Sequence, residues 1–144
     1  MANALLSKVF AASYDRFMAR TEDAGLRERR RELLAAATGD VLEIGAGTGA
    51  NSDFYSGEWN SLTITEPSHA MAQKLRQKLA GKGVEAQVIE APGEQLPLPD
   101  QSVDTVISTL VLCTVGDLDT SLAEIRRVLR PGGRFVLMQP NFRY

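Results

Sequence analysis

A glycine-rich segment in the first half of the chain has the spacing of a ligand-binding turn. Residues 41–44 are β-prone, and residues 45–49 that follow read Gly-Ala-Gly-Thr-Gly. Glycines between a strand and a helix let a ligand approach the backbone, whose amides then face it. The spacing is G-x-G-x-G, and because Ala50 follows it also satisfies the dinucleotide pattern G-x-G-x-x-A. Alone the signal is weak, since a purely structural turn has the same composition.

A carboxylate stands at the end of the next β-prone run. Glu66 follows residues 62–65 and precedes Pro67. At the end of the second strand of such a unit, a carboxylate lies beside the glycine turn and can accept hydrogen bonds from both ribose hydroxyls. Glu66 therefore predicts an adenosine cofactor, without choosing between S-adenosylmethionine and NAD. The alternative is an ordinary exposed glutamate before a turn.

Three further segments distinguish these cofactors by resemblance. They are residues 91–100 (APGEQLPLPD), residues 102–106 (SVDTV) and residues 129–133 (LRPGG), in that order and closely spaced. Together with residues 41–49 (VLEIGAGTG), the set resembles the class I S-adenosylmethionine-dependent methyltransferases, over about residues 40–138. Within that superfamily the chain looks similar to the small-molecule branch that includes the quinone C-methyltransferases. Residues 91–94 and 109–115 also look like the mammalian membrane-associated thiol methyltransferases.

This resemblance implies S-adenosyl-L-methionine as the cofactor and assigns roles by position. The glycine turn would pass under the methionine part, and the carboxylate after the second strand would hold the ribose. The loop after the third strand would border the adenine, and the residues after the fourth strand would flank the methionine part. The implied cofactor-binding residues are Tyr14, Glu43, Gly45, Ala46, Gly47, Glu66, Pro67, Met71, Gly93, Glu94, Thr109 and Leu110.

Some of these residues have structural alternatives. Met71 also fits the core stripe of its helix, and Tyr14, on an N-terminal helix that in relatives folds over the cofactor, could simply pack there. Many relatives have an aspartate where this chain has Pro92, so adenine recognition is expected to rest on backbone groups or on Glu94. Methyl transfer from a sulfonium is an in-line displacement that positioning can accelerate. We therefore assign no catalytic residue, and interpret Cys113 as a small buried hydrophobe.

The elements that must position these residues alternate between strands and helices. Helices are expected over residues 2–20 and 25–37, and strands over 41–44, 62–65, 84–89, 103–109 and 135–138. A third helix begins at the cap Ser68 and ends at Gly81, with His69 facing solvent. Asp117 caps a fourth helix, which residues 131–133 end. The inner face of this fourth helix is expected to be Leu118, Leu122, Ile125 and Leu129.

This alternation predicts an α/β fold with a Rossmann-like, doubly wound parallel sheet of five strands. The C-terminal antiparallel strands of the family are absent from the pattern. We expect residues 1–38 to form helices that cover the cofactor site and residues 39–144 to form the S-adenosylmethionine-binding core. The fifth strand would leave one sheet edge open and the apolar faces of Val136 and Met138 under-covered.

Composition narrows the function classes. The 144 residues are 44% hydrophobic with net charge −2, which argues against a nucleic-acid-coating protein. The basic run at Arg27, Arg29, Arg30 and Arg31 is interpreted as a solvated helix face. One cysteine allows no intrachain disulfide and favours a cytoplasmic location. One histidine and one cysteine build no His/Cys metal site, and no apolar run reaches the ~20 residues of a membrane span.

The pattern as a whole predicts an S-adenosylmethionine-dependent methyltransferase that acts on a small-molecule acceptor. The alternatives are a noncatalytic adenosylmethionine-binding module or fragment and an NAD-dependent oxidoreductase. The oxidoreductase is disfavoured because the chain has no Tyr-x-x-x-Lys motif. The expected partners are the small-molecule acceptor and, through the edge of the fifth strand, a second copy of the chain.

Overall fold

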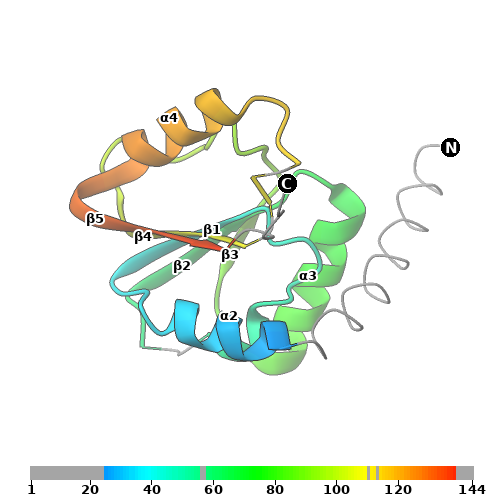
Figure 1. The fold of residues 1–144 in the computed structure, drawn as a ribbon. Coiled ribbons are helices and arrows are strands. Elements are labelled where there is room, and N and C mark those ends of the chain that lie inside the picture. The colour runs from blue at the N-terminus through cyan, green and yellow to red at the C-terminus, as the bar shows by residue number, and fades with distance from the viewer. Residues whose placement is uncertain (1–24, 56–57, 110, 113, 139–144) are drawn as a thin grey trace, which may run out of the picture.

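A parallel five-stranded sheet with helices on both faces organises the protein (Figure 1). The computed structural model describes residues 25–55, 58–109, 111–112 and 114–138. The predicted α/β class is confirmed, because every strand pair is parallel. The strands are β1 (Asp40–Ile44), β2 (Ser61–Thr65), β3 (Gln87–Ile89), β4 (Val103–Thr109) and β5 (Leu129–Met138). The helices are α2 (Arg27–Leu34), η2 (Ser52–Phe54, a 3-10 turn), α3 (His69–Lys82) and α4 (Leu118–Val128).

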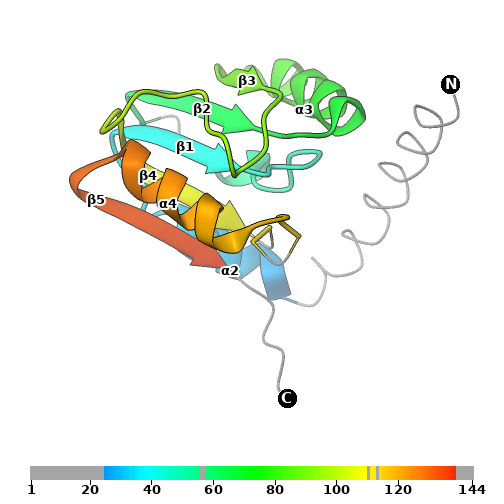
Figure 2. The ribbon, with the colours of Figure 1, turned by 90° about the horizontal axis from the view of Figure 1, so that it is seen from above.

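The order of the strands places a crevice at the centre of the sheet. The sheet runs β3-β2-β1-β4-β5, so the chain starts at β1, moves outward to β3 and then crosses to β4. The order reverses between β1 and β4, and at such a switch point the carboxyl ends of a doubly wound sheet open to a ligand. Helices α2 and α3 cover one face of the sheet, and α4 lies over β4 and β5 on the other (Figures 1 and 2).

Two apolar clusters hold these layers together. One contains Leu34 of α2 and Leu75 of α3 packed against Val41 and Ile64 of the sheet. The other packs Ile125 of α4 on the opposite face. None of the helices in the described part of the chain is long and apolar enough to cross a membrane.

Helix α3 confirms its predicted start and corrects its predicted end. The Ser68 side chain accepts a hydrogen bond from the Met71 amide, as expected of an N-cap. The helix continues through Gly81 to Lys82, and Gly83 is the residue in the left-handed conformation, with φ 66°. The Val84 amide then bonds to the Leu79 carbonyl at 3.0 Å, which satisfies an orphan carbonyl of the last turn.

Helix α4 has the predicted cap and a different buried face. Asp117 accepts from the Thr120 amide at 3.1 Å, as predicted. Leu118 and Leu122 were expected inside and are 47% and 39% exposed. The buried residues of α4 are Ser121, Ile125 and Val128. Ile125 was predicted correctly, whereas Leu118 and Leu122 were not, because these two apolar leucines lie away from the side of the helix that meets the sheet.

Strand β5 begins earlier than predicted. Leu129 already pairs with Val103, so residues 131–133 lie inside the strand rather than in a helix stop, and the register shifts before Thr105 pairs with Arg134. Along the rest of the strand the side chains alternate between the two faces.

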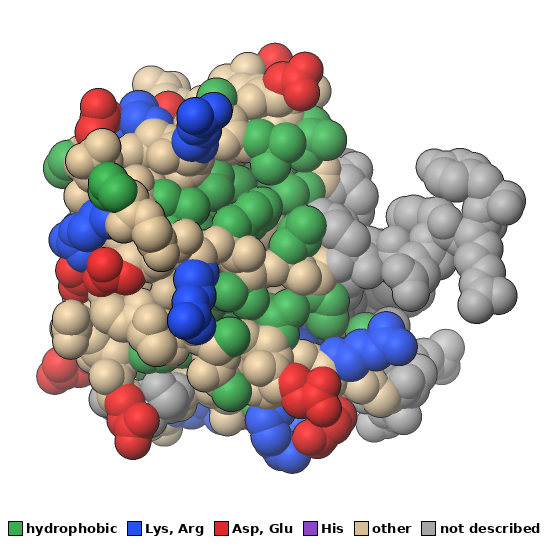
Figure 3. All heavy atoms as spheres, turned by 60° about the vertical axis from the view of Figure 1, so that its left-hand side comes forward, with side chains coloured by type: hydrophobic (Ala, Val, Ile, Leu, Met, Phe, Trp, Pro, Cys, Tyr) green, Lys and Arg blue, Asp and Glu red, His purple; other side chains and the backbone are tan. Residues whose placement is uncertain are grey.

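The apolar residues of β5 are not placed as expected. Met138 is buried and Val136 is half-buried, against the expected exposure of both, whereas Leu137 is 43% exposed. Figure 3 shows hydrophobic side chains gathered on the side of the molecule at which β5 forms the sheet edge. The large hydrophobic side chains that are exposed in the described residues are Leu118, Leu122 and Leu137.

Candidate functional site

A cavity of about 420 Å³ opens at the carboxyl ends of the strands. The glycine turn after β1, the residues after β2, the loop after β3 and the loop after β4 each supply part of its wall. Its volume lies within the range of ~300–1,000 Å³ that small-molecule sites occupy. Of the predicted cofactor-binding residues, those that line it are Gly45, Gly47, Glu66, Pro67, Met71, Gly93 and Glu94.

The other predicted residues lie elsewhere. Glu43 and Thr109 are buried and do not line the cavity, and Ala46 packs against the core on the α2 face. Tyr14 and Leu110 lie outside the described residues. Cys113 also falls outside them. A cofactor-binding role for each member of the set therefore stays a prediction.

The glycine turn adopts a backbone that other residues rarely tolerate. Gly45, Gly47 and Gly49 have φ of 62°, 59° and 94°, all in the left-handed region. The Gly45 amide donates to the Thr65 carbonyl at 2.8 Å, which fixes the turn against β2. A Cβ on Gly45 would stand 2.3 Å from Val111 Cγ1. Conformation and space therefore both require glycine at position 45.

In the described part of the chain, Glu66 is one of two glutamates that line the cavity. It is 5% exposed, and its Oε2 accepts from the Gly47 amide at 2.8 Å while its Oε1 accepts from the Ser68 amide at 3.0 Å. Burial raises the pKa of Glu66, and these two amides counteract part of that rise. Each carboxylate oxygen keeps a second lone pair, so both can still accept a ribose hydroxyl.

The donor set and the wall around Glu66 fit an adenosyl group. Ile44, Met71 and Val115 provide apolar surface for a flat ring system, and the carboxylate provides the acceptor for a vicinal diol. Such a combination of apolar surface with a few placed polar groups is typical of cofactor sites. These residues would hold S-adenosylmethionine by its adenosine half.

Glu94 clamps the loop after β3 to the loop before α4. Its Oε1 accepts from the Gly116 amide at 2.7 Å and from the Asp117 amide at 3.1 Å. Backbone hydrogen bonds, from its own amide first and then from Asp117, hold the pKa of Glu94 below its ordinary value. One oxygen of Glu94 is therefore already engaged, which limits how it can replace the aspartate that relatives have at the position of Pro92.

An exposed ion cluster joins α3 to Glu90, which follows β3, outside the residues that line the cavity. His69 Nδ1 lies 2.9 Å from Glu90 Oε1, and Arg76 Nη1 donates to the same oxygen at 2.8 Å. Hydrogen bonds from Arg76 and then from His69 lower the pKa of Glu90. His69 is exposed as predicted. Exposed pairs of this kind contribute little to stability.

A buried polar network behind the turn was not predicted. Arg30 was expected on a solvated helix face and is 1% exposed. Its Nη1 donates to Asn51 Oδ1 at 2.8 Å and to Thr109 Oγ1 at 3.2 Å. The signal that could have found it is periodicity, because Arg30 precedes the buried Leu34 by four residues and so shares its side of the helix.

Comparison with known proteins identifies the family. The methyltransferase domain family (Methyltransf_11) matches residues 42–137. The human thiol S-methyltransferase TMT1B is 39% identical over 119 residues, covering 75% of this chain and 48% of that protein. The ubiquinone/menaquinone biosynthesis C-methyltransferase UbiE of Shewanella piezotolerans is 33% identical over 121 residues, covering 82% and 45%.

Solved structures agree with the fold. A SAM-dependent methyltransferase from Thermotoga maritima superposes with a TM-score of 0.72 at 29% identity, covering 90% of this chain and 58% of that one. A protein from Methanococcus maripaludis, at 22% identity and a TM-score of 0.76, supports the fold alone. The chain spans about half the length of the curated relatives it matches. Through its methyltransferase domain the chain belongs to the class I S-adenosylmethionine-dependent methyltransferase superfamily, whose cofactor is S-adenosyl-L-methionine.

Proposed function

We propose that this chain binds S-adenosylmethionine in the cavity at the carboxyl ends of β1 and β2 and transfers its methyl group to a small-molecule acceptor. The observation that carries the proposal is the position of Glu66. Its carboxylate is buried against the Gly47 amide of the glycine turn and lines a cavity of about 420 Å³. Membership in the methyltransferase family supports the interpretation of this cavity as the cofactor site.

The chain's own residues bind and orient in this scheme. The bound cofactor supplies an electrophilic methyl group. Glu66 fixes the ribose, the glycine turn leaves room for the ligand beside the backbone, and the apolar wall at Met71 and Val115 excludes water. Holding two reactants within attack distance can lower the activation free energy by ~7–11 kcal/mol.

The acceptor favoured here is a small thiol. Two human thiol S-methyltransferases, TMT1B and TMT1A, are 39% and 38% identical to the chain. A thiol of pKa ~8.5 ionises partly without help, so it needs no general base from the protein. This suits the cavity, because the carboxylates of Glu66 and Glu94 are held by backbone amides. A quinol-type carbon acceptor is the second candidate, supported by the similarity to UbiE.

Calorimetry and a transfer assay test this proposal. Adenosylhomocysteine, adenosylmethionine and NAD are titrated in parallel, and methyl transfer from labelled adenosylmethionine is then followed with thiols, phenols and quinols. We expect both adenosyl ligands to bind and thiols to accept the methyl group. Binding of NAD alone would overturn the assignment of the cofactor. Binding of the adenosyl ligands with methyl transfer only to quinols would overturn the assignment of a thiol as the acceptor.

The open edge of β5 also supports self-association. Leu137 on this strand and Leu122 on α4 are exposed, and β5 is a sheet edge. Unpaired edges beside apolar surface favour pairing with another chain. Sedimentation of the wild type and of Leu137→Lys tests the dimer: the wild type is expected to dimerise and the variant to be monomeric. A monomeric wild type would exclude this interface.

The cytoplasmic location of the protein stays a prediction.

A further inference from the structure

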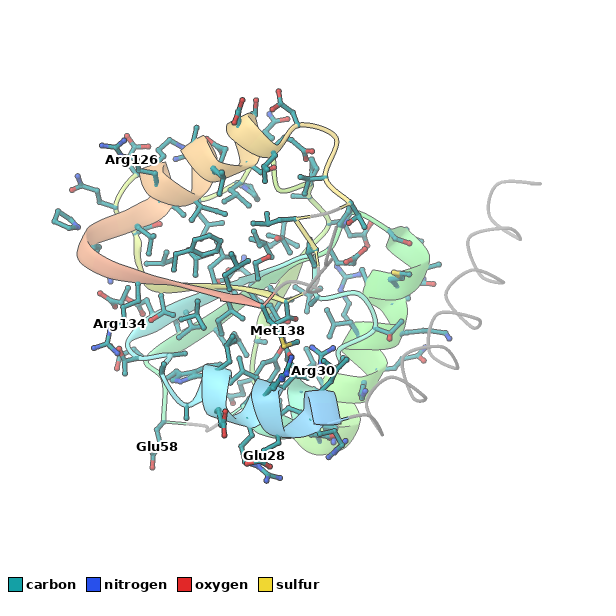
Figure 4. The ribbon with its side chains drawn as sticks, viewed as in Figure 1. Glu28, Arg30, Glu58, Arg126, Arg134 and Met138 are labelled. Carbon is teal, nitrogen blue, oxygen red and sulfur yellow. The ribbon has the colours of Figure 1, made fainter. Side chains whose placement is uncertain are left out.

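Five polar side chains form a hydrogen-bonded network behind the glycine turn. They come from α2, β1, the segment around η2 and the end of β4, and are Arg30, Glu43, Asn51, Tyr55 and Thr109. Figure 4 shows Arg30 between α2 and the sheet, whereas Glu28 on the same helix points away from the sheet. None of the five lines the cavity, so the proposed chemistry leaves the network without a role.

Asn51 is the centre of this network. Its Oδ1 accepts from Arg30 Nη1 at 2.8 Å, and its Nδ2 donates to Glu43 Oε1 at 2.6 Å and to Thr109 Oγ1 at 3.0 Å. A guanidinium only donates and a carboxylate only accepts, so the amide has a single compatible orientation. One side chain therefore ties α2, β1 and β4 to the residue that follows the turn.

The network is costly to bury. Arg30, Glu43 and Asn51 are each 1% exposed. Burial raises the pKa of Glu43, although hydrogen bonds from Tyr55 and Asn51 counteract the rise. Apolar residues of similar volume are often at least as stabilising as buried charges. Stability alone therefore gives a weak reason for placing a cation and a carboxylate here.

The location of Asn51 gives a better reason. The Ser52 amide bonds to the Gly49 carbonyl at 3.1 Å, and the Phe54 amide bonds to the Asn51 carbonyl at 2.9 Å. Asn51 therefore anchors the exit of the glycine turn to the sheet from the α2 side. From the β2 side, Glu66 holds the Gly47 amide. A turn with three left-handed glycines has many alternative conformations, and these two anchors add to the bond between the Gly45 amide and the Thr65 carbonyl in restricting it.

We propose that Asn51 is a positioning residue, whose side-chain amide holds the glycine turn in the conformation that receives the adenosyl cofactor. The proposal rests on the proposed function, because it takes this turn to be part of the cofactor site. Asn51 acts through the turn and does not touch the cavity.

The variant Asn51→Asp should make cofactor affinity depend on pH if Asn51 has the proposed role. The new carboxyl oxygen would stand about where Nδ2 now lies, 2.6 Å from Glu43 Oε1. Ionising both of two buried carboxyl groups at this separation is costly, so the pair keeps one shared proton at the lower end of the pH range and loses it only as pH rises. The shared proton replaces the present hydrogen bond, and its loss leaves two repelling charges. Buried carboxyl groups can titrate as high as about pH 8–9.

The surrounding charges act on the same pair. Among the described residues, Arg30 of α2 favours the ionised form of Glu43, whereas Glu66 disfavours it. Tyr55 donates a hydrogen bond to Glu43, and burial raises the pKa of Tyr55 well above its ordinary range, so Tyr55 stays protonated throughout the titration. The carboxyl pair is therefore the group expected to titrate.

The experiment measures adenosylhomocysteine affinity by calorimetry between about pH 6 and about pH 9. The wild type should bind with little pH dependence. Asn51→Asp should bind within about twofold of the wild type at the low end and about tenfold more weakly at the high end, which corresponds to about 1.4 kcal/mol. Asn51→Ala should be about tenfold weaker at every pH. Asn60→Asp, the same change at an exposed position, is the matched control.

Unfolding without ligand, measured in parallel, separates positioning from stability. If Asn51 served stability alone, Asn51→Ala would unfold at lower denaturant and still bind with wild-type affinity, and this result would overturn the proposal. If Asn51→Asp does not fold, the adenosylhomocysteine affinities of Asn51→Ala and Tyr55→Phe test the proposal instead. Tyr55→Phe removes only the hydroxyl that donates to Glu43. A wild type that does not bind would instead overturn the proposed function, and the positioning role with it.

Discussion

Replacing Glu66 by alanine should weaken cofactor binding by about 1.5–3 kcal/mol, the range for hydrogen bonds to a charged group. This corresponds to about tenfold to about 150-fold in the dissociation constant of adenosylhomocysteine. The upper half of the range is expected, because Glu66 is 5% exposed and its hydrogen bonds are formed away from water. The truncation also leaves the Gly47 amide without its acceptor at 2.8 Å, so the turn loses an anchor at the same time.

Glu66→Gln isolates the charge from the geometry. The amide keeps one acceptor oxygen, so it should lose less affinity than alanine does. Its nitrogen, however, faces either the Gly47 amide or the Ser68 amide, both of which are donors. We therefore expect an intermediate affinity, and a lower free energy of unfolding than in the wild type.

Calorimetry with adenosylhomocysteine measures these affinities, and Glu90→Ala is the matched control. Glu90 is an exposed glutamate that bonds to Arg76 and His69 and does not line the cavity, so its removal should leave affinity unchanged. Equal affinity of the wild type and a folded Glu66→Ala would refute the reasoning, since ribose recognition would then rest elsewhere.

Three further predictions follow from the same cavity. Gly47→Val should abolish adenosylhomocysteine binding in a titration, because φ of 59° disfavours valine and distorts the turn; a folded variant with normal affinity would place the ligand elsewhere. Adenosylhomocysteine at a hundredfold excess over its dissociation constant should stabilise the fold by ~2.7 kcal/mol in thermal melts, and NAD should not. The pKa of Glu94 is lowered from its ordinary 4.5, so its clamp stabilises the fold above that pH and is lost as pH falls through the lowered pKa. The free energy of unfolding should therefore differ less between wild type and Glu94→Gln at low pH than at neutral pH.

Much of the fold could be predicted from local patterns. The helix cap at Ser68 and the strands β1, β2 and β4 each depend on a few neighbouring residues, and the structure has them as expected, whereas β3 is shorter than the predicted 84–89. The start of β5 could not be predicted this way. Pro131 and two glycines are typical of a turn, and only pairing with β4, distant in sequence, makes them part of a strand.

The site divides in the same way. Family motifs predicted part of the cavity lining, such as Gly45, Gly47 and Gly93, because these residues lie in loops whose sequence carries the pattern, but the motifs did not predict Thr114 or Gly116. Arg30 and Asn51 were missed because Arg30 lies 21 and 79 residues from its partners Asn51 and Thr109; the helical period could place Arg30 on the buried side of α2 but could not identify these partners. A basic run on a short helix looks solvated until its partners across the sheet are known.

The close approach of Gly45 and Val111 couples the substitutions that the loops after β1 and β4 can accept. Because Val111 already fills the volume that a side chain at position 45 would need, the two positions share one space. A larger residue at position 45 would require both a different backbone and a smaller neighbour in the loop after β4. A side chain at position 45 therefore cannot be introduced alone, and a substitution of Gly45 is expected to arise together with one of Val111. In a library that randomises both, the survivors should show strong pairwise epistasis although the residues lie 66 positions apart.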